Sequence, residues 1–283
     1  DSIIGDYKAN LGELEKLVDK VPSESELVVL PELAVSGYPD APDVARKMAE
    51  NLSGSSTINS LTKISRKFDL YIVTSVIERT EQEFFNTAVI IGKDGIIGSY
   101  RKLHLTGEER KWAKPGDSGV EILDLPLGRI GLMLGYDSIF PEMARCLAIQ
   151  GVDLICIPGA MSFPEPIPMS ATTIPLPKGI DRGPSYIHWH LIRCRCEENN
   201  TVVAFANQTG GPYFGQSGIF SPRREGEPRY EKVASFDNDE IITLEMDTSS
   251  LDGALYPTSL IRNKELIRMR LPHWYDQIVT PKH

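Results

Sequence analysis

Two charged residues stand where apolar stretches of the sequence end. Glu32 follows the run Leu-Val-Val-Leu-Pro at 27–31, and Lys102 follows residues 96–101. A carboxylate can move a proton, and an ammonium group can stabilise a developing negative charge such as an oxyanion. Taken alone, however, Glu32 is typical of an ordinary loop-end carboxylate and Lys102 of a solvated surface charge.

A third segment brings these two residues into a pattern. Residues 131–137 read Gly-Leu-Met-Leu-Gly-Tyr-Asp and precede Phe-Pro-Glu at 140–142. Because the apolar part of this segment ends at Gly135, all three segments place a polar or special residue at the end of an apolar run.

The elements that must position these residues alternate between helix and strand patterns. Leucines and valines at helical spacing predict a helix over 6–21. Continuous apolar runs at 27–30 and 70–77 are typical of fully buried strands. The Asp-Gly pair at 94–95 predicts a hairpin between 88–91 and 96–100. Further helices are predicted at 56–68, 140–150 and 186–199, and further strands at 120–125, 130–134, 154–158, 202–206, 218–220 and 241–246.

This alternation predicts an α/β layered protein with a mixed sheet. Residues 161–183 are rich in Pro, Ser and Thr and predict a long loop. Because a loop of this length inside a compact domain is usually functional, we expect it to wall the substrate pocket. Neither an internal repeat nor a domain boundary is evident, so we expect a single domain over 1–283.

The composition and charge of the chain argue against two classes of binding partner, nucleic acids and membranes. The chain has 283 residues and a formal charge of −9, with 41% hydrophobic residues, which is ordinary for a globular protein. An acidic surface repels a polyanion, so we expect no nucleic-acid partner. No apolar run approaches the roughly 18 residues of a membrane span, and no signal-peptide pattern opens the chain, so we expect no membrane partner.

The cysteines and histidines give little sign of a disulfide or a metal. Cys194 and Cys196 are too close for an unstrained bridge on a helix, and none of the four cysteines forms a Cys-x-x-Cys pair. We expect buried reduced thiols, including Cys146 and Cys156, which suit a cytoplasmic location. The His-x-His at 188–190 would point to different faces of a helix, which disfavours a metal site.

Taken in order, the three segments resemble the signature segments of the nitrilase, or carbon–nitrogen hydrolase, superfamily. Supporting matches extend the resemblance over nearly the whole chain; they are Asn-Thr-Ala at 86–88, Pro-Gly-Asp at 115–117, Arg-Cys-Glu-Glu-Asn at 195–199, Ala-Asn at 206–207 and Phe-Gly-Gln-Ser-Gly at 214–218. The resemblance implies a four-layer α-β-β-α sandwich that pairs into homodimers or larger assemblies. It also implies a first strand, which we expect to be missing just before Asp1.

The resemblance assigns roles to particular residues. Glu32 would be the proton shuttle and Lys102 would stabilise the oxyanion, helped by the backbone N–H of Tyr136. A second glutamate would position water and the lysine, for which Glu109 is the better match and Glu108 the alternative. Substrate contacts are expected from four residues; they are Tyr38, Tyr136, Glu142 and Met161. The family implies no metal and no organic cofactor.

The nucleophile is where the pattern breaks. The family carries a cysteine where this chain has Gly135, and glycine has no side chain that could attack or be acylated. Two explanations stay open: an active hydrolase that has lost its thiol by engineering, or a natural pseudoenzyme that binds a small molecule or a partner chain. The retained Glu32 and Lys102 favour the first.

The substrate class follows from the same segment. Tyr136-Asp137 followed by Phe-Pro-Glu at 140–142 is similar to the amidase and N-carbamoyl branches, whereas true nitrile hydrolases usually carry a tryptophan at this position. We therefore expect a small amide or carbamoyl substrate. The apolar residues of the 161–183 loop suggest room for an apolar substituent.

Overall fold

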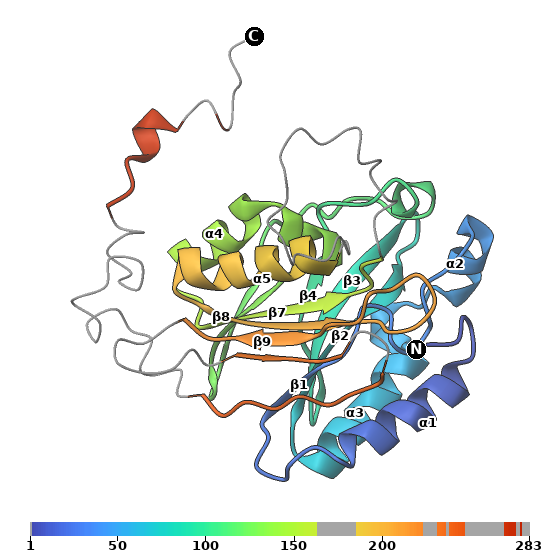
Figure 1. The fold of residues 1–283 in the computed structure, drawn as a ribbon. Coiled ribbons are helices and arrows are strands. Elements are labelled where there is room, and N and C mark those ends of the chain that lie inside the picture. The colour runs from blue at the N-terminus through green and yellow to red at the C-terminus, as the bar shows by residue number, and fades with distance from the viewer. Residues whose placement is uncertain are drawn as a thin grey trace, which may run out of the picture.

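The computed structural model describes residues 2–162, 185–222, 231–235, 238–246, 269–275 and 278. Two β-sheets pack face to face between two layers of helices (Figure 1). The four-layer α-β-β-α sandwich is therefore confirmed. Most of the predicted 161–183 loop lies outside the described residues.

The first sheet has four strands in chain order. They are β1 (Leu27–Val29), β2 (Tyr71–Arg79), β3 (Phe84–Gly92) and β4 (Gly95–Arg101). β1 pairs parallel with β2, and the remaining pairs are antiparallel. The predicted hairpin is confirmed: Gly95 closes the β3–β4 turn at a φ of +120°, which glycine adopts readily.

The second sheet has six strands in the order β10-β9-β8-β7-β6-β5. The central strands β6, β7 and β8 are parallel, and the outer pairs are antiparallel. The bounds are β5 (Ile122–Leu125), β6 (Gly128–Leu132), β7 (Leu154–Gly159), β8 (Val202–Asn207), β9 (Gly218–Phe220) and β10 (Glu231–Val233). Both sheets are mixed, as the hairpin connections predict.

The helices cover the outer faces. Helices α1 (Tyr7–Val18) and α3 (Ser56–Phe68) lie over the first sheet, with α2 (Pro42–Met48) near its edge, whereas α4 (Pro141–Ile149) and α5 (Ser185–Asn199) lie over the second (Figure 1). Side-chain caps fix where two helices begin. The Asp6 carboxylate accepts from the Ala9 N–H at 3.0 Å, and the Ser55 hydroxyl accepts from the Ile58 N–H at 3.0 Å.

Alternation along each strand builds two cores from one sheet. Val73 and Ile90 point inward to the second sheet, while Ile72 and Val89 pack against α1 and α3. Successive residues of a strand face opposite sides, so a sheet covered on both faces needs apolar residues at every position. This explains why the middle strands appear in the sequence as continuous apolar runs.

Several sequence predictions are wrong in detail. Residues 241–246 do not form a strand, and β1 is only half-buried although its run is fully apolar. Both line one cavity, and within the described residues neither 241–246 nor the outer side of β1 has a strand partner. The helix α2 and the short strand β10 were not predicted, since neither has a long periodic pattern.

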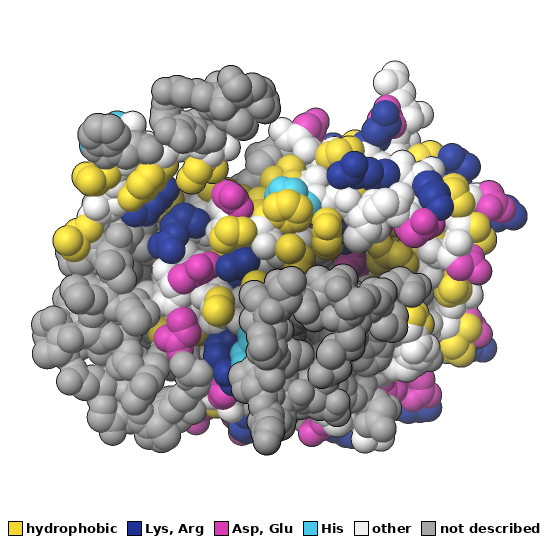
Figure 2. Space-filling view, turned by 45° about the horizontal axis from the view of Figure 1, so that its top comes forward, with side chains coloured by type: hydrophobic (Ala, Val, Ile, Leu, Met, Phe, Trp, Pro, Cys, Tyr) yellow, Lys and Arg dark blue, Asp and Glu magenta, His cyan; other side chains and the backbone are white. Residues whose placement is uncertain are grey.

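The described surface carries mixed charge. On the face shown in Figure 2, Lys and Arg side chains are interspersed with Asp and Glu and do not gather into one basic patch. Within the described ranges, no helix is both long enough and apolar enough to cross a bilayer.

Candidate active site

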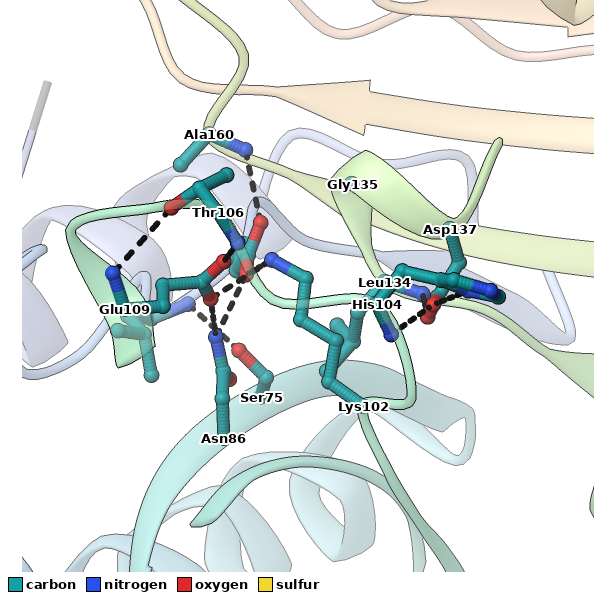
Figure 3. A network of polar contacts seen from close by, with 12 residues as sticks. Ser75, Asn86, Lys102, His104, Thr106, Glu109, Leu134, Gly135, Asp137 and Ala160 are labelled. Carbon is teal, nitrogen blue, oxygen red and sulfur yellow. Dashed lines mark hydrogen bonds and ion pairs between the residues drawn. The ribbon is translucent and has the colours of Figure 1, made fainter. Parts of the chain in front are cut away.

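The polar site lies where strand ends of the two sheets meet. Glu32 comes three residues after β1, Lys102 directly follows β4, and Gly135 opens the 3₁₀ turn Gly135–Ile139 after β6. Figure 3 shows Lys102, Asn86 and Glu109 converging on one network beside Gly135. The structure therefore brings together the three strand ends that the sequence singled out.

One lysine holds two carboxylates. Lys102 Nζ lies 2.7 Å from Glu32 Oε1 and 2.7 Å from Glu109 Oε1. The side chains of Lys102 and Glu32 are each 2% exposed and that of Glu109 is fully buried. Because buried charges are tolerated only when paired, this three-residue ion cluster is a built feature of the fold. Glu108, the sequence alternative, is exposed and pairs with Lys111 instead.

Asn86 completes this cluster, and sequence reasoning missed it as a site residue. Its Nδ2 donates to Glu32 Oε1 at 2.6 Å and to Glu109 Oε1 at 2.9 Å. Its backbone carbonyl accepts from the Lys102 N–H at 2.9 Å, which fixes Lys102 beside β3. The Asn-Thr-Ala match at 86–88 was the available signal, because a buried asparagine at a strand start needs polar partners.

Local backbone structure positions Glu109. The Glu109 N–H donates to Thr106 Oγ1 at 3.3 Å, and the Thr106 N–H donates back to Glu109 Oε2 at 2.9 Å. This reciprocal pair closes the loop 106–109 that leads into the 3₁₀ turn Glu109–Lys111. It leaves Glu109 Oε1 free to accept from Lys102 and Asn86.

Burial and the shared Lys102 move the pKa values of Glu32 and Glu109 in opposite directions. Burial raises the pKa of Glu32 to about 7, against the lowering effect of Lys102. Burial also opposes ionisation of Glu109, but the charge and hydrogen bond of Lys102 outweigh it and lower the pKa. Two carboxylates with pKa values pushed apart suit different roles, one exchanging a proton near neutral pH and one staying charged.

Gly135 faces the Glu32 carboxylate. A Cβ built on Gly135 would lie 2.5 Å from Glu32 Oε2 and 3.8 Å from the backbone nitrogen of Ala160. The Ala160 N–H in turn donates to Glu32 Oε2 at 3.2 Å. A side chain at position 135 would therefore point at the acid best suited to accept its proton.

Asp137 anchors the turn that follows Gly135. Its buried carboxylate accepts from the Tyr100 hydroxyl at 2.8 Å and from the backbone N–H groups of Leu134 and His104 at 3.1 and 2.9 Å. His104 Nδ1 lies 2.9 Å from the same carboxylate. These contacts tie the turn of the second sheet to the end of β4. Sequence reasoning did not single out Tyr100 or His104, because only the fold brings them to Asp137.

The predicted substrate contacts divide into three near the site and one apart. Burial and the carboxylates of Glu109 and Glu32 hold the pKa of Tyr38 well above its usual range, which places its hydroxyl close to both acids. Met161 is buried, and Tyr136 is 38% exposed on the turn after Gly135. Glu142 is exposed on the first turn of α4 and is not part of the Lys102 network.

The prediction that all four cysteines are buried is wrong for two of them. Cys156 and Cys196 are buried, but Cys146 and Cys194 are exposed on α4 and α5. Burial raises the pKa of the Cys156 thiol far above neutral, so this thiol stays protonated. The described residues include no group of three or more His, Cys, Asp or Glu side chains arranged to hold a metal ion. His188 has no described side chain, and His190 is exposed.

Several known proteins are similar to this chain in sequence. Residues 3–251 match the carbon–nitrogen hydrolase family. The chain is 30% identical over 263 residues to a nitrilase from Pyrococcus abyssi, covering 91% of this chain and 87% of that one. It is 30% identical over 285 residues to the chloroplastic omega-amidase of Arabidopsis thaliana, covering 93% and 70% of the two chains.

Solved structures agree on the fold. A carbon–nitrogen hydrolase from Helicobacter pylori G27 superposes with a TM-score of 0.80 at 22% identity, covering all of this chain and 97% of the other. An amidase of the same superfamily from Nesterenkonia sp. AN1 gives a TM-score of 0.65 at 22% identity, covering 78% and 79%. With its family match over most of its length, its amidase-type relatives and this shared fold, the chain belongs to the carbon–nitrogen hydrolase family of the nitrilase superfamily.

Proposed function

We propose that the chain is the scaffold of an amidase-type or N-carbamoyl-type hydrolase that lacks its nucleophile. Position 135 is where the thiol of an active form would stand, and Glu32, Lys102 and Glu109 are the groups that would serve it. The observation that carries this proposal is the direction of the missing side chain: a Cβ on Gly135 would point at Glu32 Oε2.

With a cysteine at position 135, the reaction runs through two acyl transfers. Ionised Glu32 takes the thiol proton, the thiolate attacks the amide or carbamoyl carbon, and Lys102 with the Tyr136 backbone N–H stabilises the oxyanion. Protonated Glu32 then gives its proton to the leaving nitrogen, and ammonia departs. Water, deprotonated by Glu32 and oriented by Glu109, cleaves the thioester and regenerates the thiol.

With glycine at position 135, the chain can bind a substrate but has no side-chain atom there that could form the thioester. Tyr38, Tyr136, Glu142 and Met161 are the substrate contacts in this proposal, with the 161–183 loop setting specificity. A single domain over 1–283, a homodimer or larger assembly and a cytoplasmic location belong to the same proposal. Sedimentation analysis and cell fractionation test the last two.

The decisive experiment restores the thiol. Gly135→Cys is assayed for ammonia release from primary amides, ω-amides, N-carbamoyl compounds and nitriles, beside the parent chain. Gly135→Ala is the matched control, because it adds the same Cβ at the same strained position without a thiol. Adding Glu32→Gln to Gly135→Cys should reduce the rate by about 10²-fold or more, as expected when a proton shuttle is removed.

The outcomes separate the two explanations of Gly135. Activity in Gly135→Cys alone supports a hydrolase scaffold with Glu32 and Lys102 in working geometry. A folded but silent Gly135→Cys, together with a ligand-dependent rise in the melting temperature of the parent chain, would instead support a pseudoenzyme that binds small amides or carbamoyl compounds.

A further inference from the structure

The residue that follows Glu32 has a backbone conformation that leucine disfavours. Leu33 has a φ of +53°, in the left-handed region, where its Cβ comes close to a neighbouring carbonyl oxygen. Among the described residues, the other non-glycine residues with a positive φ are polar; they are Asp69, Asn200 and Gln216. Because strained residues persist only where the surrounding structure over-determines them, the contacts beside Leu33 must hold it in place.

Side chains of β2 hold the chain just beyond β1. Pro31 has no N–H and cannot continue the backbone ladder between the two strands. The Thr74 hydroxyl donates instead to the Pro31 carbonyl at 2.9 Å. The Leu33 N–H donates to Ser75 Oγ at 2.9 Å, and Ser75 is only 1% exposed. Because a buried N–H without an acceptor is costly, the Ser75 hydroxyl favours the backbone conformation that brings the Leu33 N–H to it.

This arrangement fixes the direction of Glu32, which lies between the two anchored residues. Its carboxylate oxygen Oε1 accepts from Asn86 Nδ2 at 2.6 Å and from Lys102 Nζ at 2.7 Å. Ser75 and Asn86 belong to the neighbouring strands β2 and β3, and Figure 3 shows both in the lower part of the network that Glu32 joins. The backbone is thus fixed on both sides of Glu32, which restricts where its side chain can point.

We propose that Ser75 is a positioning residue of the proposed active site. Its hydroxyl holds Leu33 in the left-handed conformation, and the sharp turn at Leu33 directs the Glu32 carboxylate across to Lys102 and to residue 135. The Leu33 side chain is fully buried in an apolar cluster, and this burial offsets the strain of the turn. The catalytic consequence rests on the proposed function, whereas the effect on the backbone does not.

The strain at Leu33 is tested by comparing alanine with glycine at this position. Both variants lose the buried side chain, but glycine adopts a positive φ readily, so the unfolding equilibrium constant of Leu33→Gly should be about fivefold or more below that of Leu33→Ala. Leu61, which is fully buried in α3, is the matched control. There the order should reverse, because glycine weakens a helix. A Leu33→Ala variant at least as stable as Leu33→Gly would overturn the proposal.

The effect of the Ser75 hydroxyl on Glu32 is tested without an assay of activity. The NMR signals of the Asn86 side-chain amide report its hydrogen bond to Glu32, so Ser75→Ala should shift them. Ser65→Ala is the matched control, because Ser65 is equally buried and its hydroxyl also bonds the backbone, donating to Leu70 O at 2.7 Å. That change should leave the Asn86 signals in place. Unshifted Asn86 signals in a folded Ser75→Ala would mean that the hydroxyl has only a structural role.

A rescue experiment separates positioning from direct contact. Adding Leu33→Gly to Ser75→Ala should return the Asn86 signals toward those of the parent chain, because glycine keeps the turn without help from the hydroxyl. In the Gly135→Cys chain, Ser75→Ala should lower kcat by about tenfold or more and change KM by less than about twofold. A raised KM with an unchanged kcat would contradict the proposal. A silent Gly135→Cys would count against the proposed function, and the Asn86 signals would still decide the role of Ser75.

Discussion

Glu32 and Gly135 face each other so closely that a Cβ on residue 135 would lie 2.5 Å from Glu32 Oε2. Gly135 also has a φ of +33°, in the left-handed region that side chains disfavour. Any side chain at position 135 must therefore accept backbone strain and displace a buried carboxylate. A side chain at position 135 would therefore lower the stability of the fold.

We expect Gly135→Ala to lower the free energy of unfolding by about 1–3 kcal/mol, measured by urea denaturation. Gly12→Ala is the matched control. Gly12 lies in α1, a Cβ added to it would meet nothing within 4 Å, and its φ is ordinary. That change should stabilise the chain by about 0.5–1 kcal/mol. Equal effects of the two substitutions would contradict the strain at Gly135.

Lys102 and Lys111 make a matched pair of ion-pair tests. Lys102→Met leaves two buried carboxylates without their shared cation, so we expect a loss of roughly 3–5 kcal/mol in stability near pH 8. Lys111→Met removes only the exposed pair with Glu108, and its effect should stay within about 1 kcal/mol. A small effect at Lys102 would mean that the three-residue cluster is not formed in solution.

The raised pKa of Glu32 predicts the sign of a pH dependence. Between about pH 4.5 and 7 the folded chain keeps a proton on Glu32 that the unfolded chain releases, so stability falls as pH rises through this window. The pKa difference is worth on the order of 3 kcal/mol. The lowered pKa of Glu109 makes stability depend on pH only below this window.

The measurement compares free energies of unfolding at several pH values in the parent chain and in Glu32→Gln. The difference in free energy of unfolding, parent minus Glu32→Gln, should fall as pH rises from about 4.5 to 7 and stay constant above pH 7. This is expected because only the parent chain has a titratable group at position 32. A parallel pH profile for both chains would show that Glu32 has an ordinary pKa.

In a thiol-labelling experiment, two of the four cysteines should react rapidly in the native chain. Cys146 and Cys194 are exposed on neighbouring helices, whereas Cys156 and Cys196 are buried. A chromogenic disulfide reagent should therefore react with two thiols in the native chain and with all four after denaturation. Cys146→Ser and Cys194→Ser should each remove one fast thiol. Fast reaction of Cys156 would indicate that β7 opens to solvent.

The sequence predicted the elements with strong periodic patterns. The β3–β4 hairpin was found because Asp-Gly is a specific turn signal, and the α3 helix because its apolar residues keep one face. The strand at 241–246 was predicted wrongly, since an apolar run shows only a preference for extended backbone. Whether it becomes a strand depends on a partner edge, which the run itself does not specify.

The site could be predicted only in part, for a similar reason. Glu32, Lys102 and Glu109 stood in recognisable segments, and the structure brings them within hydrogen-bonding distance. Asn86 was visible only as part of a strand-start motif. That it bridges two carboxylates depends on how the segments after β1 and β4 fold back to Asn86 in β3, and no spacing rule along one segment specifies this.

Glu32 follows a strand of the first sheet, yet three hydrogen bonds attach it to the second. Its N–H donates to Gly159 O at 3.1 Å, its carbonyl accepts from Gln208 Nε2 at 3.0 Å, and its carboxylate accepts from the Ala160 N–H. The residue thus joins the two halves of the sandwich. A chain that has folded only one sheet therefore does not bring Gly135 to the Glu32 carboxylate. Substitutions that shift one sheet against the other should alter this site even when they lie far from it.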